Sequence, residues 1–149
     1  MLRVILALAL MTSLAACGTR LNPFNWFGEG REERVRVSET IPENPLDRRF
    51  LVSEVVDFSI DPTAQGVILR AMGRPQTQGH WEADLVEVAR ENGALIYEFR
   101  VFPPPTPTPA GTPQSREVIT GLELSQFDLR GIRTITVVGA ENRRSITRR

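Results

Sequence analysis

Hydrophobic and polar positions alternate in short runs along residues 50–149, as they do in half-buried β-strands. The first run places its hydrophobic positions at Phe50, Val52, Val56, Phe58 and Ile60. Further strands are expected over residues 67–72, 80–90, 94–102, 117–124, 132–138 and 144–147. Turn-forming residues separate the runs. The pattern predicts a mainly β fold, a small antiparallel β-sandwich, for which we expect an immunoglobulin-like or a transthyretin-like topology.

The strands over residues 80–90 and 94–102 form the clearest hairpin, because Asn92-Gly93 lies between them. A two-residue turn would place Glu87 opposite Glu98, and directly opposed like charges are unfavourable. A three-residue loop, 91–93, with Gly93 in the left-handed conformation moves the pairing by one residue. We therefore expect the three-residue loop.

This register fixes which side chains lie on each face of the hairpin. Its cross-strand pairs are Asp84 with Arg100, Leu85 with Phe99, and Val88 with Ile96. The face toward the core would carry Trp81, Ala83, Leu85, Leu95, Tyr97, Phe99 and Val101. Val86, Val88 and Ile96 would lie on the opposite face. There a second sheet covers them, or they form an exposed contact patch.

Residues 1–16 have the pattern of a secretory signal peptide. A short start with one arginine, Arg3, precedes an apolar run over residues 4–11, and small residues precede Cys17. The apolar run is far shorter than the ~20 residues that cross a bilayer as a helix. One interpretation is an ordinary secretory signal followed by a free cysteine.

Leu14-Ala15-Ala16-Cys17 resembles the bacterial lipobox, and this resemblance favours a lipoprotein. It implies that the Cys17 thiol receives diacylglycerol, that cleavage follows Ala16, and that the new amino group is acylated. A thiolate is the nucleophile that such a transfer needs. Gly18 stands where aspartate would favour the inner membrane, so the resemblance implies the outer membrane, facing the periplasm. The inner membrane is the alternative.

Residues 17–49 are expected to form a lipidated tether before the domain at residues 50–149. Phe24, Trp26 and Phe27 follow the lipidation site closely, and aromatic side chains prefer the membrane interface. Alternatively, this segment folds back onto the domain or binds a partner. Residues 22–28 also resemble the start of small uncharacterised Gram-negative lipoproteins. The charged run over residues 29–36 has helical potential and is expected to be a solvated spacer.

A proline-rich segment and a basic C-terminal end are two further candidates for contacts with other molecules. The proline-rich residues 103–113 predict a poorly packed, polyproline II-like loop that serves as a flexible connection or as a binding epitope. The basic residues at the C-terminal end are expected to be solvated, or to contact anionic lipid headgroups or cell-wall polymers. They are Arg143, Arg144, Arg148 and Arg149.

Composition narrows the chemistry. The 149-residue chain has a formal net charge of zero, which gives no electrostatic case for nucleic acid. Its single cysteine excludes an internal disulfide and a cysteine-rich zinc site. Membrane lipid, reached through acylated Cys17, and an envelope protein are the expected partners.

Candidate catalytic and metal-binding arrangements are weak. His80, Glu82 and Asp84 share one strand face, but ligands two residues apart lie ~6–7 Å from one another, too wide for a compact metal site. The expected alternative is a solvated face with Asp84 paired to Arg100. The serine candidates, none of which lies in a nucleophile elbow, are Ser53, Ser59 and Ser125. We expect no catalytic residue, no metal and no cofactor.

The sequence therefore favours a lipid-anchored periplasmic protein with a non-enzymatic binding or structural role. The alternative is a small-ligand carrier or an enzyme of envelope chemistry, for which a concave apolar pocket with converging polar groups would be required. A third possibility is an accessory of outer-membrane β-barrel assembly.

Overall fold

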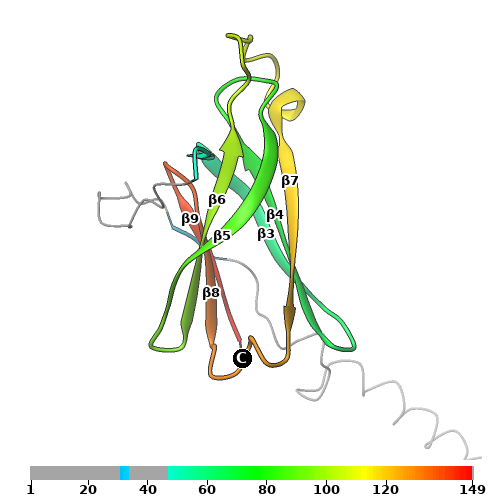
Figure 1. Cartoon of the computed structure of the whole chain (residues 1–149), viewed down its shortest axis with the longest axis vertical. Helices are drawn as coiled ribbons and strands as arrows, with labels where there is room; N and C mark the ends of the chain where they lie inside the picture. The colour runs from blue at the N-terminus through cyan, green and yellow to red at the C-terminus, as the bar shows by residue number, and fades with distance from the viewer. Residues whose placement is uncertain (1–30, 34–46, 149) are drawn as a thin grey trace, which may run out of the picture.

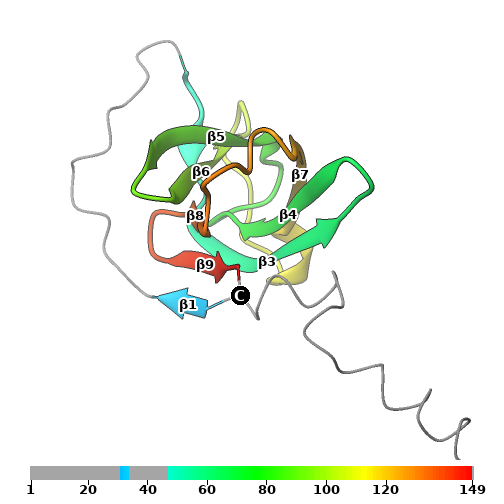
Figure 2. The same ribbon diagram turned by 90° about the horizontal axis from the view of Figure 1, so that it is seen from below.

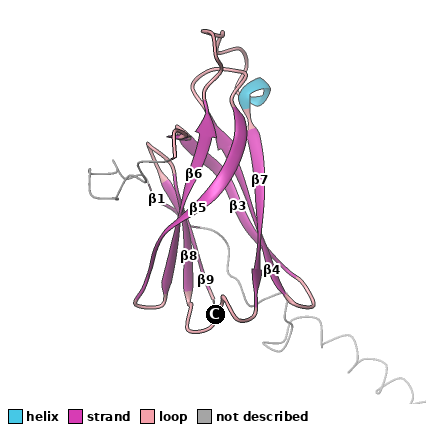
Figure 3. Cartoon of the chain, in the orientation of Figure 1, coloured by secondary structure: helices cyan, strands magenta, loops and turns pink. Residues whose placement is uncertain are grey.

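The computed structural model describes residues 31–33 and 47–148, and all structural statements concern these residues (Figure 1). The described part is mainly β, as expected (Figure 3). Its strands are β1 (Arg31–Glu33), β2 (Phe50–Leu51), β3 (Glu54–Pro62), β4 (Gly66–Arg74), β5 (Trp81–Glu91), β6 (Ala94–Phe102), β7 (Val118–Ser125), β8 (Thr134–Val138) and β9 (Arg143–Thr147). A short 3-10 helix spans Gln114–Arg116. Within the described ranges, no helix has the length and apolar character to span a bilayer.

The strands form a six-stranded and a three-stranded sheet. In the larger sheet the hydrogen-bonded order is β1-β9-β8-β6-β2, and β5 is a further neighbour that pairs with β6. The smaller sheet has the order β3-β4-β7. β6 pairs in parallel with β8, so the larger sheet is mixed rather than purely antiparallel as we expected. β6 is therefore the central strand, with β8 and β2 pairing along one edge and β5 along the other.

The core lies between the two sheets. Figure 2 shows their strands surrounding a common interior, with β5 beside β7 and β3 beside β9. The largest side chains with almost no exposed surface are Tyr97, Phe99, Leu69, Leu95, Ile135, Val52, Val55, Val101 and Val137. These residues come from both sheets and from the link between β2 and β3. Their burial supplies the main driving force for packing the sheets together.

The hairpin prediction is confirmed in part. Asp84 is opposite Arg100 and Leu85 is opposite Phe99, as expected. The predicted three-residue loop is wrong, because Glu91 pairs with Ala94 and only two residues form the turn. Asn92 and Gly93 both have positive φ, 53° and 78°, as a type I′ turn requires.

A bulge reconciles this short turn with the expected register farther along the hairpin. The pairing shifts between Glu87 and Ala89, so Val88 is the extra residue and Ala89 is opposite Ile96. The predicted Val88–Ile96 pair is therefore wrong. Glu87 is opposite Tyr97 and Val86 is opposite Glu98, so the unfavourable Glu87–Glu98 pair is avoided. Val86, Val88 and Ile96 are half-buried, which removes the main support for an exposed contact patch there.

The prediction that Trp81 lies in the core is wrong, because β5 has a second irregularity near its start. The other predicted residues on that face are buried, except Ala83, which is partly buried against the core. Between Trp81 and Asp84 the pairing with β6 shifts, and Glu82 has a φ of 48°. Strict alternation is lost at this point, and Trp81 lies on the outer face, 54% exposed.

The first predicted strand is divided between the two sheets. Phe50 lies in β2 and is exposed, whereas the residues from Glu54 onward form β3 of the smaller sheet. The pairing with β4 shifts between Val55 and Asp57, so Val55 is buried in place of Val56. The buried Asn142 holds this bulge, because its Oδ1 accepts from the Val55 amide at 2.7 Å and its Nδ2 donates to the Val55 carbonyl at 3.0 Å.

Two charged segments also differ from expectation. Arg31–Glu33, within the predicted helical spacer, is the strand β1 and pairs with β9. Arg143 and Arg144 are half-buried residues of β9 rather than part of a solvated tail, and Arg144 Nε donates to the Val55 carbonyl at 2.8 Å. Arg148 is exposed, whereas Arg149 lies outside the described residues.

Candidate functional site

The most unusual surface lies at the end of the molecule where β5 begins and β6 ends. We call it the proline end, because it comprises loop 75–80 and the proline-rich chain 103–117, at the top of Figure 1. Trp81 stacks there on its cross-strand neighbour Phe102, with ring centroids 5.1 Å apart and an angle of 23° between the planes. The left-handed backbone of Glu82 places the indole outside. A non-glycine residue in this conformation costs about 1–2 kcal/mol, and such strain is concentrated at functional sites.

An open hollow adjoins this aromatic pair on the outer face of β5 and β6. Its lining residues are Asp47, Arg48, Arg49, Glu82, Asp84, Val86 and Phe102. Phe102 thus joins the two features, since it stacks on Trp81 and also forms part of the hollow. The lining combines both charge signs with an aromatic edge, a composition suited to a polar partner that also stacks.

Buried charges lie on the same outer face of β6. Glu98 is 2% exposed and Arg100 is 5% exposed, and Arg100 Nε donates to Glu98 Oε2 at 2.6 Å. Arg100 Nη1 also donates to the Arg49 carbonyl at 3.2 Å. The prediction of an ion pair between Asp84 and Arg100 is therefore wrong. The two residues are opposite in the backbone register, but the partner of Arg100 lies two residues away on its own strand.

Arg49 organises the acidic groups of the hollow. Its Nε and Nη2 donate to Asp47 at 2.9 and 2.8 Å, and its Nη1 donates to Asp84 at 3.0 Å. The hydrogen bonds from Arg49 lower the pKa of Asp47 to about 2, with partial burial opposing the shift. The same contacts raise the pKa of Arg49 above its ordinary value. This network holds the hollow in one arrangement, and Glu82 and Arg48 remain exposed at its rim.

The proline-rich segment is hydrogen-bonded to the neighbouring loop. The Gln78 amide donates to the Pro109 carbonyl at 3.0 Å, and Thr108 Oγ1 donates to the Gln78 carbonyl at 2.6 Å. Gln78 Nε2 also donates to Ser115 Oγ at 2.6 Å. These contacts tie the segment to the neighbouring loop, while most of its residues are exposed, as expected of a poorly packed loop.

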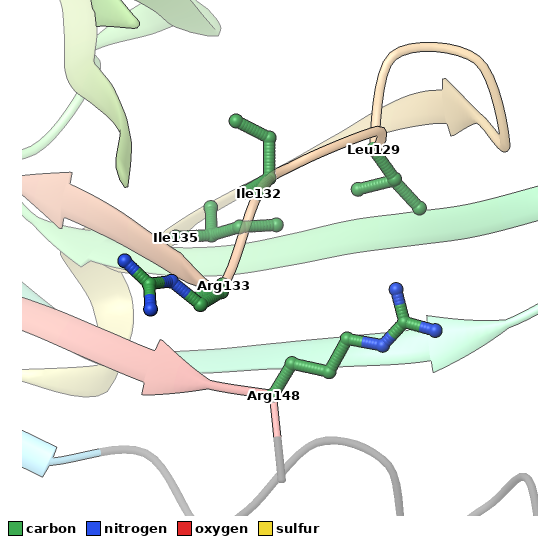
Figure 4. A pocket seen from close by; sticks show the side chains of 5 residues that line it. All are labelled: Leu129, Ile132, Arg133, Ile135 and Arg148. Carbon is green, nitrogen blue, oxygen red and sulfur yellow. The ribbon is translucent and has the colours of Figure 1, made fainter. Parts of the chain in front are cut away.

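A second, smaller hollow lies at the opposite end, which we call the C-terminal end: the turn 92–93, loop 126–133 and residues 147–148. Figure 4 shows Leu129, Ile132 and Ile135 lining it, with Arg133 and Arg148 on its two sides. The three aliphatic side chains belong to the buried core. The loop that carries Arg133 is thereby fixed to the domain.

Within the described ranges, the residues considered for catalysis or metal binding do not assemble into a site. No group of three histidine, cysteine or acidic residues there could hold a metal ion. His80 Nδ1 donates to the Thr77 carbonyl at 3.0 Å, and Ser125 Oγ donates to Asp128 Oδ2 at 2.6 Å. No hydrogen bond found joins His80 to Ser53, Ser59 or Ser125.

The predicted lipidation and membrane residues, Cys17, Phe24, Trp26 and Phe27, lie outside the described residues. Sequence reasoning missed Trp81, Phe102 and Arg49 as members of one surface. The alternation pattern placed Trp81 in the core, and no sequence signal marked the left-handed Glu82. Comparison with known proteins gave no match to a family model, to a curated protein or to a solved structure.

Proposed function

We propose that this chain is a lipid-anchored periplasmic protein of the bacterial envelope that binds a partner without catalysing a reaction. The lipobox-like Leu14-Ala15-Ala16-Cys17 supports anchoring through acylated Cys17, and Gly18 supports the outer membrane. Phe24, Trp26 and Phe27 would lie at the lipid headgroups. Two or more acyl chains suffice for stable anchoring without a membrane-spanning helix.

We further propose that the two sheets form a β-sandwich that serves as a rigid support for the binding surface. The core shared by the two sheets supports this classification. An immunoglobulin-like or transthyretin-like topology for this sandwich would have to include the parallel pairing of β6 with β8.

The observation that carries the binding role is the exposed Trp81, stacked on Phe102 beside the charged hollow. Tryptophan and arginine are the residue types that contribute most at protein interfaces. Here Trp81 is exposed where the backbone is strained, and Arg49 is already held by Asp47 and Asp84. A surface whose side chains are fixed in advance loses little conformational entropy on binding.

The test compares what co-purifies with the native lipoprotein and with Trp81→Ala from detergent extracts of the envelope. Ile119→Ala is the matched control, because Ile119 is similarly exposed, at 62%, but lies on β7 of the other sheet. We expect one partner to be retained by the native chain and by Ile119→Ala and lost from Trp81→Ala. Equal retention by all three chains would contradict a binding role for this surface.

A further inference from the structure

The pairing of β1 with β9 shows from which end the chain leads back toward Cys17. Arg31 is opposite Ser145 and Glu33 is opposite Arg143, so β1 runs antiparallel to β9. The start of β1 therefore points toward the C-terminal end of the molecule, where β9 finishes. Residues 18–30 separate Cys17 from β1. A chain of this length spans at most about 50 Å, so a lipid attached at Cys17 lies within that distance of Arg31.

The C-terminal end presents an exposed aromatic ring together with arginines. Phe127 is 69% exposed, and the guanidinium carbon of Arg130 lies 4.6 Å from the centre of its ring. Arg133 is exposed on the same loop, and no carboxylate of the described residues pairs with Arg130 or Arg133. An exposed ring beside a guanidinium group, with a second arginine on the same loop, is a pattern that favours the headgroup region of a membrane.

The carboxylates at this end offset part of the positive charge, but none of those in the described residues forms an ion pair with Arg130 or Arg133. Asp128 is held back toward β7, because its Oδ2 accepts from the Ser125 amide at 2.9 Å and from the Ser125 hydroxyl at 2.6 Å. Glu87 pairs with Arg90 at 2.9 Å. Glu91 is the other exposed carboxylate next to the turn.

We propose that the C-terminal end docks onto the anionic phospholipid surface of the membrane that holds Cys17, with Phe127 inserted among the headgroups. This inference rests on the proposed lipid anchoring. The basic loop is fixed by Leu129 and Ile132 in the core, so the domain presents it as a rigid surface. Each arginine near an anionic surface strengthens binding about fivefold, which is weak alone. A short tether raises the effective concentration of the membrane and makes such weak docking effective.

Docking in this orientation would direct Trp81 and the hollow away from the membrane. The proline end and the C-terminal end lie at opposite ends of β5 and β6 (Figure 1). A partner in the periplasm could then reach Trp81 and Phe102 without competing with lipid.

The experiment measures how deeply position 127 enters the bilayer. The lipidated chain is given a single tryptophan by combining Phe127→Trp with Trp26→Phe and Trp81→Phe. This variant is reconstituted in vesicles of phosphatidylethanolamine and phosphatidylglycerol. Some of the lipids carry a nitroxide quencher near the headgroup. The matched control places the single tryptophan at Ile119→Trp, a similarly exposed position close to the proline end. We expect the lipid quencher to reduce the fluorescence of the tryptophan at position 127 and to leave that at position 119 unchanged.

Charge reversal separates docking from anchoring. In the Phe127→Trp chain, Arg130→Glu with Arg133→Glu should abolish most of the quenching, and so should replacing phosphatidylglycerol with phosphatidylcholine. Absence of quenching at position 127 in a chain that takes up labelled palmitate would overturn the docking and leave the anchoring intact. Absence of palmitate uptake would instead overturn the proposed function. Quenching that persists with both arginines reversed would contradict the electrostatic part of the proposal.

Discussion

The proline end and the C-terminal end are both formed by the hairpin of β5 and β6, yet they are built differently. At the C-terminal end, Asn92-Gly93 provides the backbone conformation that a tight turn needs, and a bulge at Val88 corrects the register. At the proline end the left-handed residue is Glu82, for which this conformation is unfavourable. The first irregularity keeps Leu85 and Phe99 in the core, whereas the second places Trp81 in solvent.

The difference suggests a division of the hairpin between the stability of the fold and the proposed binding surface. Near the turn, the irregularity serves the fold, because it removes an opposed pair of glutamates. Near Trp81, the irregularity exposes a large aromatic side chain beside organised charges and has no evident benefit for the core. The strained backbone at Glu82 does not improve the packing of the core, which is a reason to propose a function for the proline end.

The largest expected effect comes from the buried ion pair on the outer face of β6. Arg100→Met should lower the free energy of unfolding by about 3–5 kcal/mol, because Glu98 then remains buried without a partner. The double variant Glu98→Leu with Arg100→Met should recover most of this loss, since neither charge remains. Denaturant unfolding followed by circular dichroism measures both. If the single and double variants are equally unstable, the pair does not account for the stability of this face.

A glycine substitution tests the turn at the C-terminal end. Gly93→Ala should cost about 1–2 kcal/mol, because an L-residue at a φ of 78° is strained. Its Cβ would also lie 3.0 Å from the Gly131 carbonyl oxygen. Gly121→Ala is the matched control, since its Cβ meets nothing closer than 3.6 Å and its φ is not positive. Equal stabilities of the two variants in thermal unfolding would show that the turn does not constrain this end.

The charged hollow predicts a pH dependence at the proline end. The folded pKa of Asp47 is about 2, below its ordinary value of 3.8, because of the hydrogen bonds from Arg49. The stabilisation from Asp47 is therefore complete above about pH 4 and is lost as the pH falls through about 2, with a magnitude on the order of 1 kcal/mol. Asp47→Asn should remove this part of the acid dependence. Asp61→Asn, on the other sheet, should keep it, and a reversed result would show that the hollow is not pre-organised.

The smallest expected effect has the opposite sign. Glu82→Gly should raise the free energy of unfolding by about 0.5–1 kcal/mol, because glycine accepts the left-handed conformation and part of the gain is offset by its flexibility when unfolded. Glu82→Gln keeps the strain and should leave stability unchanged. A loss of stability in the glycine variant would mean that Glu82 is not strained, and the contrast between the two ends would then disappear.

The sequence predicts the regular parts of the fold and fails where the backbone departs from a simple period. Strands β4, β5 and β6 and the pairs Asp84–Arg100 and Leu85–Phe99 follow from alternation and from avoiding opposed charges. Alternation assumes one residue per pleat, so it cannot anticipate an extra residue in a bulge such as that at Val88.

The candidate site was not predictable for the same reason. Trp81 changes face through the irregularity at Glu82, and its stacking on Phe102 follows from that change. Arg49 comes from the segment before β2 and reaches Asp84 across 35 positions of the sequence. Arg100 pairs with the buried Glu98 and not with Asp84. Rules for cross-strand pairs do not include burial, so they could not predict this partner.

The proposed contrast between an end that docks on the membrane and an end that faces a partner depends on the proposed lipid at Cys17. The most direct measurement is incorporation of radioactive palmitate into the native chain and into Cys17→Ser. Our account predicts label on the native chain, fractionating with the outer membrane, and none on Cys17→Ser. Label on Cys17→Ser, or an unlabelled native chain, would contradict it.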